Sequence, residues 1–178
     1  MTLTIRAARE DDLSAITAIY DDAVTHGTSS YELTPPDLAE MRGRFEVLKA
    51  GGYPYLVAEM EGDVAGYAYA GAFRPRPAYR FIVEDSVYVS PRHKGQGVGR
   101  ALMEALIAEA SRLGFRQIIA VIGDGNPESA SVKLHAKVGF TDAGKLVGTG
   151  YKHGRWLDTA FMQLALNEGA DAPPDPAS

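Results

Sequence analysis

A glutamate in a strand-like run carries the strongest chemical signal in this chain. Glu84 lies within the run Phe81–Val89, which is otherwise largely apolar. A carboxylate buried in such a run is costly without partners, and burial raises its pKa toward values useful to a general base. A solvated strand edge and a structural ion pair are the alternatives, and a β-bulge would exchange the faces of Glu84 and Asp85. We therefore expect a base at Glu84, on the same face as Ser86 and Tyr88.

A glycine-rich loop follows this run and opens a helical pattern. It consists of Lys94, Gly95, Gln96, Gly97, Val98, Gly99 and Arg100. Strand, glycine loop and helix together can bind phosphate, because the first helical N–H groups are unpaired and glycines let a ligand approach the backbone. Lys94 and Arg100 add positive charge at the edges of the loop. A glycine-rich turn without a ligand is the alternative.

The spacing of the glycines excludes two common nucleotide motifs. A Walker A loop needs Gly-Lys-Ser/Thr, but Gly99 is followed by Arg100 and Ala101, and a dinucleotide fingerprint needs glycine where Arg100 stands. The pattern Q/R-x-x-G-x-G fits, with Lys94 in the first place. In this the loop resembles the acyl-CoA pyrophosphate loop of the GNAT superfamily of N-acetyltransferases. Lysine keeps the contact basic but offers no planar side chain for hydrogen bonding.

Composition narrows the class of protein. The chain has 178 residues, of which 46% are apolar, so one domain with a full core is expected. A net charge of −5 without a basic cluster disfavours nucleic acid as a partner. The lack of cysteine excludes disulfides, a thiolate metal site and a cysteine nucleophile. There is no apolar run of membrane-spanning length and no signal-peptide pattern, so we expect a cytoplasmic protein without metal or membrane partners.

Periodicity and turn signals predict eleven elements in the order βααβββαβαββ. The fold class expected is α/β (α+β), a mixed, mostly antiparallel sheet of about seven strands flanked by about four helices. We expect one domain at 1–166 and a disordered tail at 167–178. The expected strands are 2–7, 55–60, 64–72, 81–89, 117–122, 140–146 and 156–166. The expected helices are 13–26, 38–49, 98–113 and 126–138, the last capped by Asn126.

Several segments resemble one branch of the GNAT superfamily, the phosphinothricin and methionine sulfoximine N-acetyltransferases. The resembling segments are Tyr55–Glu59, Ala68–Gly71, Arg74–Tyr79, Glu84–Val89, Val121–Gly123, Asn126, His135 and Lys152–Trp156. The glycine loop marks only the superfamily. The arginine loop and the strand around Glu84 are more specific to the branch, and the element order is that of the GNAT fold.

The resemblance implies a cosubstrate, a substrate class and an assembly. Acetyl-CoA would lie with its pantetheine arm along the main chain of Val87, Tyr88 and Val89, and with its pyrophosphate on the segment Lys94–Gly99. Asn126 would lie near the thioester. The branch acts on the α-amino group of small amino acids and usually forms homodimers.

Three further residues are candidates for the chemistry of the thioester and the amine. His135 is a second candidate base, although a lone helix histidine is more often structural or lines a pocket. Tyr88 and Asn126 could steady the thioester or donate a proton to the leaving thiolate. Core packing is the alternative for Tyr88, and helix capping for Asn126.

Two arginines and two tyrosines are candidates for binding the acceptor. Arg74 and Arg76 alternate with prolines, which favour an extended backbone, so both guanidinium groups are expected to project to one side. They match carboxylate or phosphinate oxygens, and a solvated charged loop is the alternative. Tyr31 and Tyr79 are expected as pocket walls. The run Tyr151–Trp156 is expected to form a hairpin tip that closes the pocket or contacts a second subunit.

Together these residues predict an N-acetyltransferase. The amine of a small amino acid or analogue, such as phosphinothricin, methionine sulfoximine or methionine sulfone, would attack acetyl-CoA directly with Glu84 as base. A transferase for protein N-termini or other amines is one alternative. A non-catalytic acyl-CoA-binding module is another, and it would need neither Glu84 nor the arginine pair.

Overall fold

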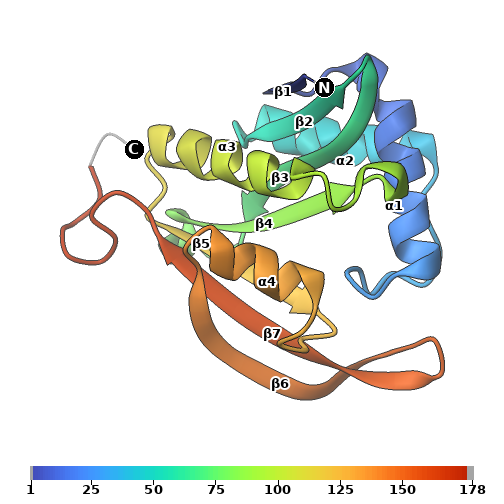
Figure 1. Ribbon diagram of the computed structural model, residues 1–178. Coiled ribbons are helices and arrows are strands. Elements are labelled where there is room, and N and C mark those ends of the chain that lie inside the picture. The colour runs from blue at the N-terminus through green and yellow to red at the C-terminus, as the bar shows by residue number, and fades with distance from the viewer. Residues whose placement is uncertain (1, 176–178) are drawn as a thin grey trace.

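A computed structural model describes residues 2–175 as a seven-stranded sheet with helices on both faces (Figure 1). The strand order is β1-β2-β3-β4-β5-β7-β6, and all neighbours are antiparallel except β4 and β5. The strands are β1 Leu3–Ala7, β2 Tyr55–Met60, β3 Asp63–Ala72, β4 Ile82–Val89, β5 Gln117–Gly123, β6 Thr141–Lys152 and β7 Arg155–Ala165. The helices are α1 Leu13–His26, α2 Leu38–Ala50, α3 Val98–Arg112 and α4 Ala130–Lys137. The predicted fold class and element order are confirmed.

The central strands alternate between two apolar clusters on opposite faces of the sheet. On β3, Ala68 and Ala70 belong to the cluster with α3, whereas Tyr67 and Tyr69 pack into the cluster with α1 and α2. Figure 1 shows α3 and α4 in front of the sheet and α2 behind it. Among residues 2–175, no helix has both the length and the apolar character needed to cross a bilayer.

β4 and β5 pair over only part of their length. Three residue pairs join them, from Ile82 with Gln117 to Glu84 with Ile119. Beyond Glu84, β4 continues to Val89 without pairing to β5, while β5 stays paired with β7 up to Gly123. The two central strands therefore separate at Glu84, and the main chain of β4 beyond it is available on that side.

The start of α4 differs from the prediction. The helix begins at Ala130, and the side chain of Ser129 accepts a hydrogen bond from the Val132 amide at 3.2 Å. The Oδ1 atom of Asn126 instead accepts from the Glu128 amide at 2.9 Å. An Asn-Pro pair is typical of both a helix cap and a local turn, and here it forms the turn.

Strand β6 of the β6–β7 hairpin is longer than predicted, whereas the turn lies at His153 and Gly154 as expected. β6 extends to Lys152, and only His153 and Gly154, both with positive φ (52° and 73°), separate it from β7. The register shifts between Asp142 and Gly144 and again between Leu146 and Gly150. These irregularities break the alternation of apolar and polar residues, which is why the pattern predicted the end of the strand too early.

The segment after β7 makes contacts in its described part. The guanidinium group of Arg116 donates to the main-chain oxygens of Gly169, Ala172 and Pro173. Asn167 donates to the Ser111 oxygen. The disorder predicted for 167–178 and the domain boundary remain predictions, and residues 176–178 lie outside the described part of the chain.

Candidate active site

Glu84 and Asp85 lie on opposite faces of β4. β3 pairs with β4 without a bulge there, with Gly71 opposite Glu84 and Ala70 opposite Asp85. Glu84 is half-buried, and its pKa is raised, first by burial and second by the charge of Asp85, while Arg74 acts in the opposite direction. A half-buried carboxylate with a raised pKa has the properties of a general base.

Asp85 forms a buried pair with His135 of α4, a contact that the sequence did not indicate. Its Oδ2 atom lies 2.9 Å from Nε2 of His135, and the two side chains are 1% and 3% exposed. Nδ1 of His135 lies 2.7 Å from the main-chain oxygen of Ser131. Both ring nitrogens are thus engaged, so a role of His135 as base would require one of these contacts to break.

The face of β4 that carries Glu84 is lined by tyrosines. The ring of Tyr88 lies edge-on to Tyr20, with 5.0 Å between centroids, and stacks on Tyr67 at 5.3 Å. Burial, together with neighbouring tyrosines, raises the pKa of Tyr88 well above its usual value. Tyr88 therefore keeps its proton at neutral pH, which suits a proton donor and also suits a structural residue.

A small cavity of about 40 Å³ lies where β4 and β5 separate. It is lined by Asp85–Tyr88 of β4, by Ala120–Gly123 at the end of β5, and by Ser29, Ser131 and His135. The segment predicted to follow the pantetheine arm, Val87–Val89, thus borders a cavity over most of its length. Asn126 lies on the surface just beyond β5.

The glycine loop has the geometry expected of a ligand-binding turn. Gly95 and Gly97 have φ of 75° and 83°, and no described atom lies within 4 Å of a Cβ placed on either. Gly97 caps the N-terminus of α3. Gly99 differs, because a Cβ there would lie 3.2 Å from Leu134, so packing against α4 constrains this glycine.

The charged residues of the loop are exposed. Lys94 and Gln96 are at the surface, and Gln96 donates to the Arg92 oxygen at 3.0 Å. Arg100 donates to Glu104 at 2.7 Å. Of the two predicted cationic contacts, Arg100 is already paired with Glu104. Lys94 has no hydrogen-bond partner among the described residues.

The arginine loop, Arg74–Tyr79, follows β3, whose residue Gly71 pairs with Glu84. The guanidinium group of Arg74 lies over the ring of Phe73, 5.2 Å from its centroid, and its charge acts on Glu84. Tyr79 packs edge-on against Phe73 at 5.8 Å. Arg76 is exposed at the start of the short turn Pro77–Tyr79. The structure thus brings Arg74 near Glu84, and joint binding by Arg74 and Arg76 remains a prediction.

Tyr31 is bonded into the scaffold. Its hydroxyl donates to the Asp158 oxygen at 2.9 Å and accepts from the Asp124 amide at 3.3 Å. Its ring fills the space where a Cβ on Gly123 or Gly150 would lie, within 2.8 Å of it. Tyr31 therefore fixes the loop after α1 against β5 and the β6–β7 hairpin.

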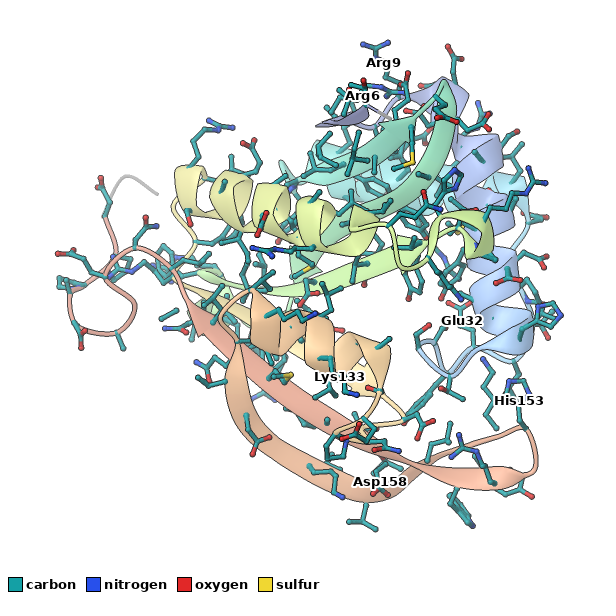
Figure 2. The ribbon with its side chains drawn as sticks, viewed as in Figure 1. Arg6, Arg9, Glu32, Lys133, His153 and Asp158 are labelled. Carbon is teal, nitrogen blue, oxygen red and sulfur yellow. The ribbon has the colours of Figure 1, made fainter. Side chains whose placement is uncertain are left out.

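The hairpin tip contacts the same loop. The ammonium group of Lys152 is buried and donates to the Ser30 oxygen at 2.8 Å, and Nε2 of His153 lies 3.1 Å from the Gly27 oxygen. Figure 2 shows His153 at the tip and Glu32 farther along the loop. Burial lowers the pKa of Lys152, and the charge of Glu32 acts against this. The predicted hairpin tip thus helps to shape the border of the site.

Within the described part of the chain, no three histidine or acidic side chains gather closely enough to hold a metal ion. The site is therefore built from a half-buried carboxylate, a glycine loop at a helix N-terminus, a cavity between two central strands and a nearby arginine loop. Such a combination can bind a phosphate-containing ligand and remove a proton beside it.

Comparison with known proteins identifies the class. Residues 5–161 match the family described as the acetyltransferase (GNAT) domain, and the chain belongs to this family. It is 52% identical to phosphinothricin N-acetyltransferase of Alcaligenes faecalis, over 97% of this chain and 87% of that protein. It is 43% identical to L-methionine sulfoximine/L-methionine sulfone acetyltransferase of Pseudomonas aeruginosa, over 97% of this chain and 100% of that protein.

A solved structure shows the same fold at similar identity. The GNAT superfamily phosphinothricin acetyltransferase from Sinorhizobium meliloti, in complex with acetyl-CoA, superimposes with a TM-score of 0.95 at 52% identity. The match covers 99% of this chain and 95% of that one. The predicted family and branch are thus confirmed, and the chain is an N-acetyltransferase of the GNAT family.

Proposed function

We propose that this protein transfers the acetyl group of acetyl-CoA to the α-amino group of phosphinothricin, methionine sulfoximine or methionine sulfone. The names of the relatives support this acceptor class. The observation that carries the mechanism is the half-buried carboxylate of Glu84, which lies where β4 and β5 separate. Its raised pKa and its place beside the arginine loop suit a base that acts on an amine.

We call the space between the ends of β4 and β5, together with the adjoining glycine loop, the cleft. The residues of this cleft fit acetyl-CoA. Gly95 and Gly97 leave open space beside the N-terminus of α3, where the helix dipole and unpaired amides favour a pyrophosphate. Lys94 would add a cation. The main chain of Val87–Val89, which β5 does not pair, would bond the pantetheine arm, and Asn126 would lie toward the thioester.

The reaction is a direct transfer. Glu84 takes a proton from the acceptor ammonium group, directly or through water, and leaves a neutral amine. The amine nitrogen bonds to the thioester carbonyl carbon, the carbon–sulfur bond breaks, and the nitrogen releases its extra proton to form the neutral amide. The thiolate takes one proton from a donor, which is then reprotonated by the proton that the nitrogen released. Tyr88 is the proposed donor to the thiolate, because its raised pKa keeps the phenol protonated.

The acceptor would be held by its oxygens. Arg74 and Arg76 offer forked donors to a carboxylate or to the head group, and hydrogen bonds of this kind between charged groups are among the stronger ones. Tyr79 would border this region, while Tyr31 would act through the loop it fixes. Anchoring both ends of the acceptor would present its nitrogen to the thioester.

A homodimer in the cytoplasm is part of the proposal. Large apolar side chains on β6 and β7 are at least half exposed, which is unusual for a free surface. They are Leu146, Val147, Tyr151 and Trp156. A second copy of the chain would cover them, and light scattering that gives the mass of one chain at micromolar concentration would contradict this.

The function is tested by measuring thiol release from acetyl-CoA with a panel of acceptors. We expect methionine sulfoximine, methionine sulfone or phosphinothricin to react at least about tenfold faster than leucine or a lysine peptide, because neither of these offers a side-chain oxygen to the arginine donors. Arg74→Ala and Arg76→Ala should each raise the acceptor KM with the acetyl-CoA KM nearly unchanged. If leucine reacted as fast as these acceptors, the protein would still be an acetyltransferase, but the proposed acceptor class would be wrong.

A further inference from the structure

The buried pair Asp85–His135 lies at the point where the cleft begins. Asp85 is the first residue of β4 beyond the last pair with β5, and His135 belongs to the helix that follows β5. The 2.9 Å contact between them therefore joins the two sides of the opening. Both residues border the cavity described above.

The hydrogen-bond partners of His135 fix the protons of the pair. The Ser131 main-chain oxygen, 2.7 Å from Nδ1, can only accept, so Nδ1 carries a proton. Nε2 then either donates to an ionised Asp85 as part of an imidazolium or accepts from a protonated Asp85. In both states the pair carries no net charge and holds one shared proton between Nε2 and Oδ2.

The environment favours such a neutral pair. The Oδ1 atom of Asp85 is buried without a hydrogen-bond partner among the described residues, which costs less for a neutral acid than for a carboxylate. Asp85 shares its face of β4 with Val83, which belongs to an apolar cluster that includes Leu102 and Leu106 of α3 and Ile118 of β5. The ring of Phe140 lies edge-on to His135 at 5.0 Å.

We propose that Asp85 and His135 form a proton-dependent clasp that holds α4 against β4 and so keeps the acetyl-CoA cleft in its binding shape. Asp85 is then a positioning residue and touches neither the acceptor nor the thioester. This inference rests on the proposed function in one respect, namely that the cleft binds acetyl-CoA. Removing the shared proton would set the lone pair of Nε2 against a carboxylate and open the clasp.

The direction of the pH dependence follows from the charges that face the pair. Burial lowers the pKa of His135, but the hydrogen bond and charge of Asp85 outweigh it, so the pKa is raised overall. From β4 the charged neighbour is Asp85, since Glu84 points to the other face, and from α4 the contacts are the oxygens of Ser131. The clasp is therefore intact below the ordinary histidine pKa and is lost as the pH rises through the raised one.

The variant Asp85→Asn provides a matched test. An asparagine amide can donate to Nε2 as the protonated acid does, but it has no proton to lose near neutral pH. We expect calorimetric Kd values for acetyl-CoA to rise about tenfold in the native protein above the raised pKa, the size expected for one hydrogen bond to a charged group. Dividing the native Kd by the Asp85→Asn Kd at each pH cancels the effects of groups that titrate in both proteins. We expect this ratio to rise with pH.

Two further measurements separate the clasp from a purely structural role. In ¹⁵N NMR spectra, Nδ1 of His135 should be protonated in the native protein at neutral pH and in Asp85→Asn over the whole range. The near-isosteric Asp85→Leu should raise the Kd about tenfold at every pH. Circular dichroism establishes which variants fold. If Asp85→Leu does not fold, the ratio of the native Kd to the Asp85→Asn Kd still tests the clasp.

The outcomes are distinct. A ratio that stays flat up to pH 9.5, or a His135 whose Nδ1 is unprotonated at neutral pH, would overturn the clasp. A native protein that folds but does not bind acetyl-CoA at all would contradict the proposed function instead.

Discussion

Glu84 and Asp85 are adjacent carboxylates whose surroundings differ completely. Glu84 is half-buried on the tyrosine-lined face, where the charge of the exposed Arg74 acts on it. The side chain of Asp85 is 1% exposed on the opposite face and is hydrogen-bonded to His135. The alternation of a regular strand therefore gives two identical chemical groups different surroundings, one half-buried beside an arginine and one locked into the scaffold.

Removing the acid–base group of Glu84 should have the largest effect on activity. Glu84→Gln should lower kcat/KM roughly 10²-fold or more, because the acceptor ammonium group loses its base. Binding of acetyl-CoA should be unchanged. In the native enzyme kcat/KM should fall as the pH drops through the pKa of Glu84, which is raised above the usual glutamate range, and this acidic limb should be missing in the variant.

The pH–rate profile and calorimetry check these expectations. His135→Ala serves as the comparison on the other face. If His135→Ala abolished the acidic limb and Glu84→Gln left it in place, the roles of the two residues would have to be exchanged.

A change in the glycine loop should have a smaller effect, because it blocks the cleft and leaves both carboxylates in place. Gly97→Ala should raise the Kd of acetyl-CoA about tenfold, the equivalent of one lost good contact. Gly62→Ala is the matched control, since Gly62 has a similar φ of 89° and equally open surroundings, in the β2–β3 turn. Each variant should lose about 1 kcal/mol of unfolding free energy through backbone strain. If both folded variants bound acetyl-CoA with equal affinity, the glycine loop would not be part of the binding site.

The smallest effect is expected within the tyrosine face itself. The hydroxyl of Tyr67 is buried without a hydrogen-bond partner among the described residues, so Tyr67→Phe should leave activity unchanged and stabilise the protein by up to about 1 kcal/mol. Tyr20→Phe should instead destabilise it by about 1 kcal/mol, because Tyr20 is hydrogen-bonded to Ser30 at 2.9 Å. Thermal unfolding measures both, and a loss of activity in Tyr67→Phe would show that this face does more than support Glu84.

Local patterns in the sequence determined most of the fold and part of the site. The spacing of apolar residues predicted the helix α1, and strand alternation placed Glu84 with Ser86 and Tyr88. The glycine loop and the helix that follows it were predicted from local spacing, and Gly95 and Gly97 have positive φ in the structure. These features depend on residues a few positions apart, so they can be read from the chain itself.

Contacts between distant segments were decided only by the tertiary structure. Asp85 and His135 are 50 residues apart, and Lys152 and Ser30 are 122 apart. Tyr31 was expected as a pocket wall, but its hydroxyl is bonded to the main chain of Asp158. Whether a buried polar group acts as a base or only holds two segments together depends on the group with which it forms a hydrogen bond. That partner is set by how the sheet and helices pack, which no local pattern specifies.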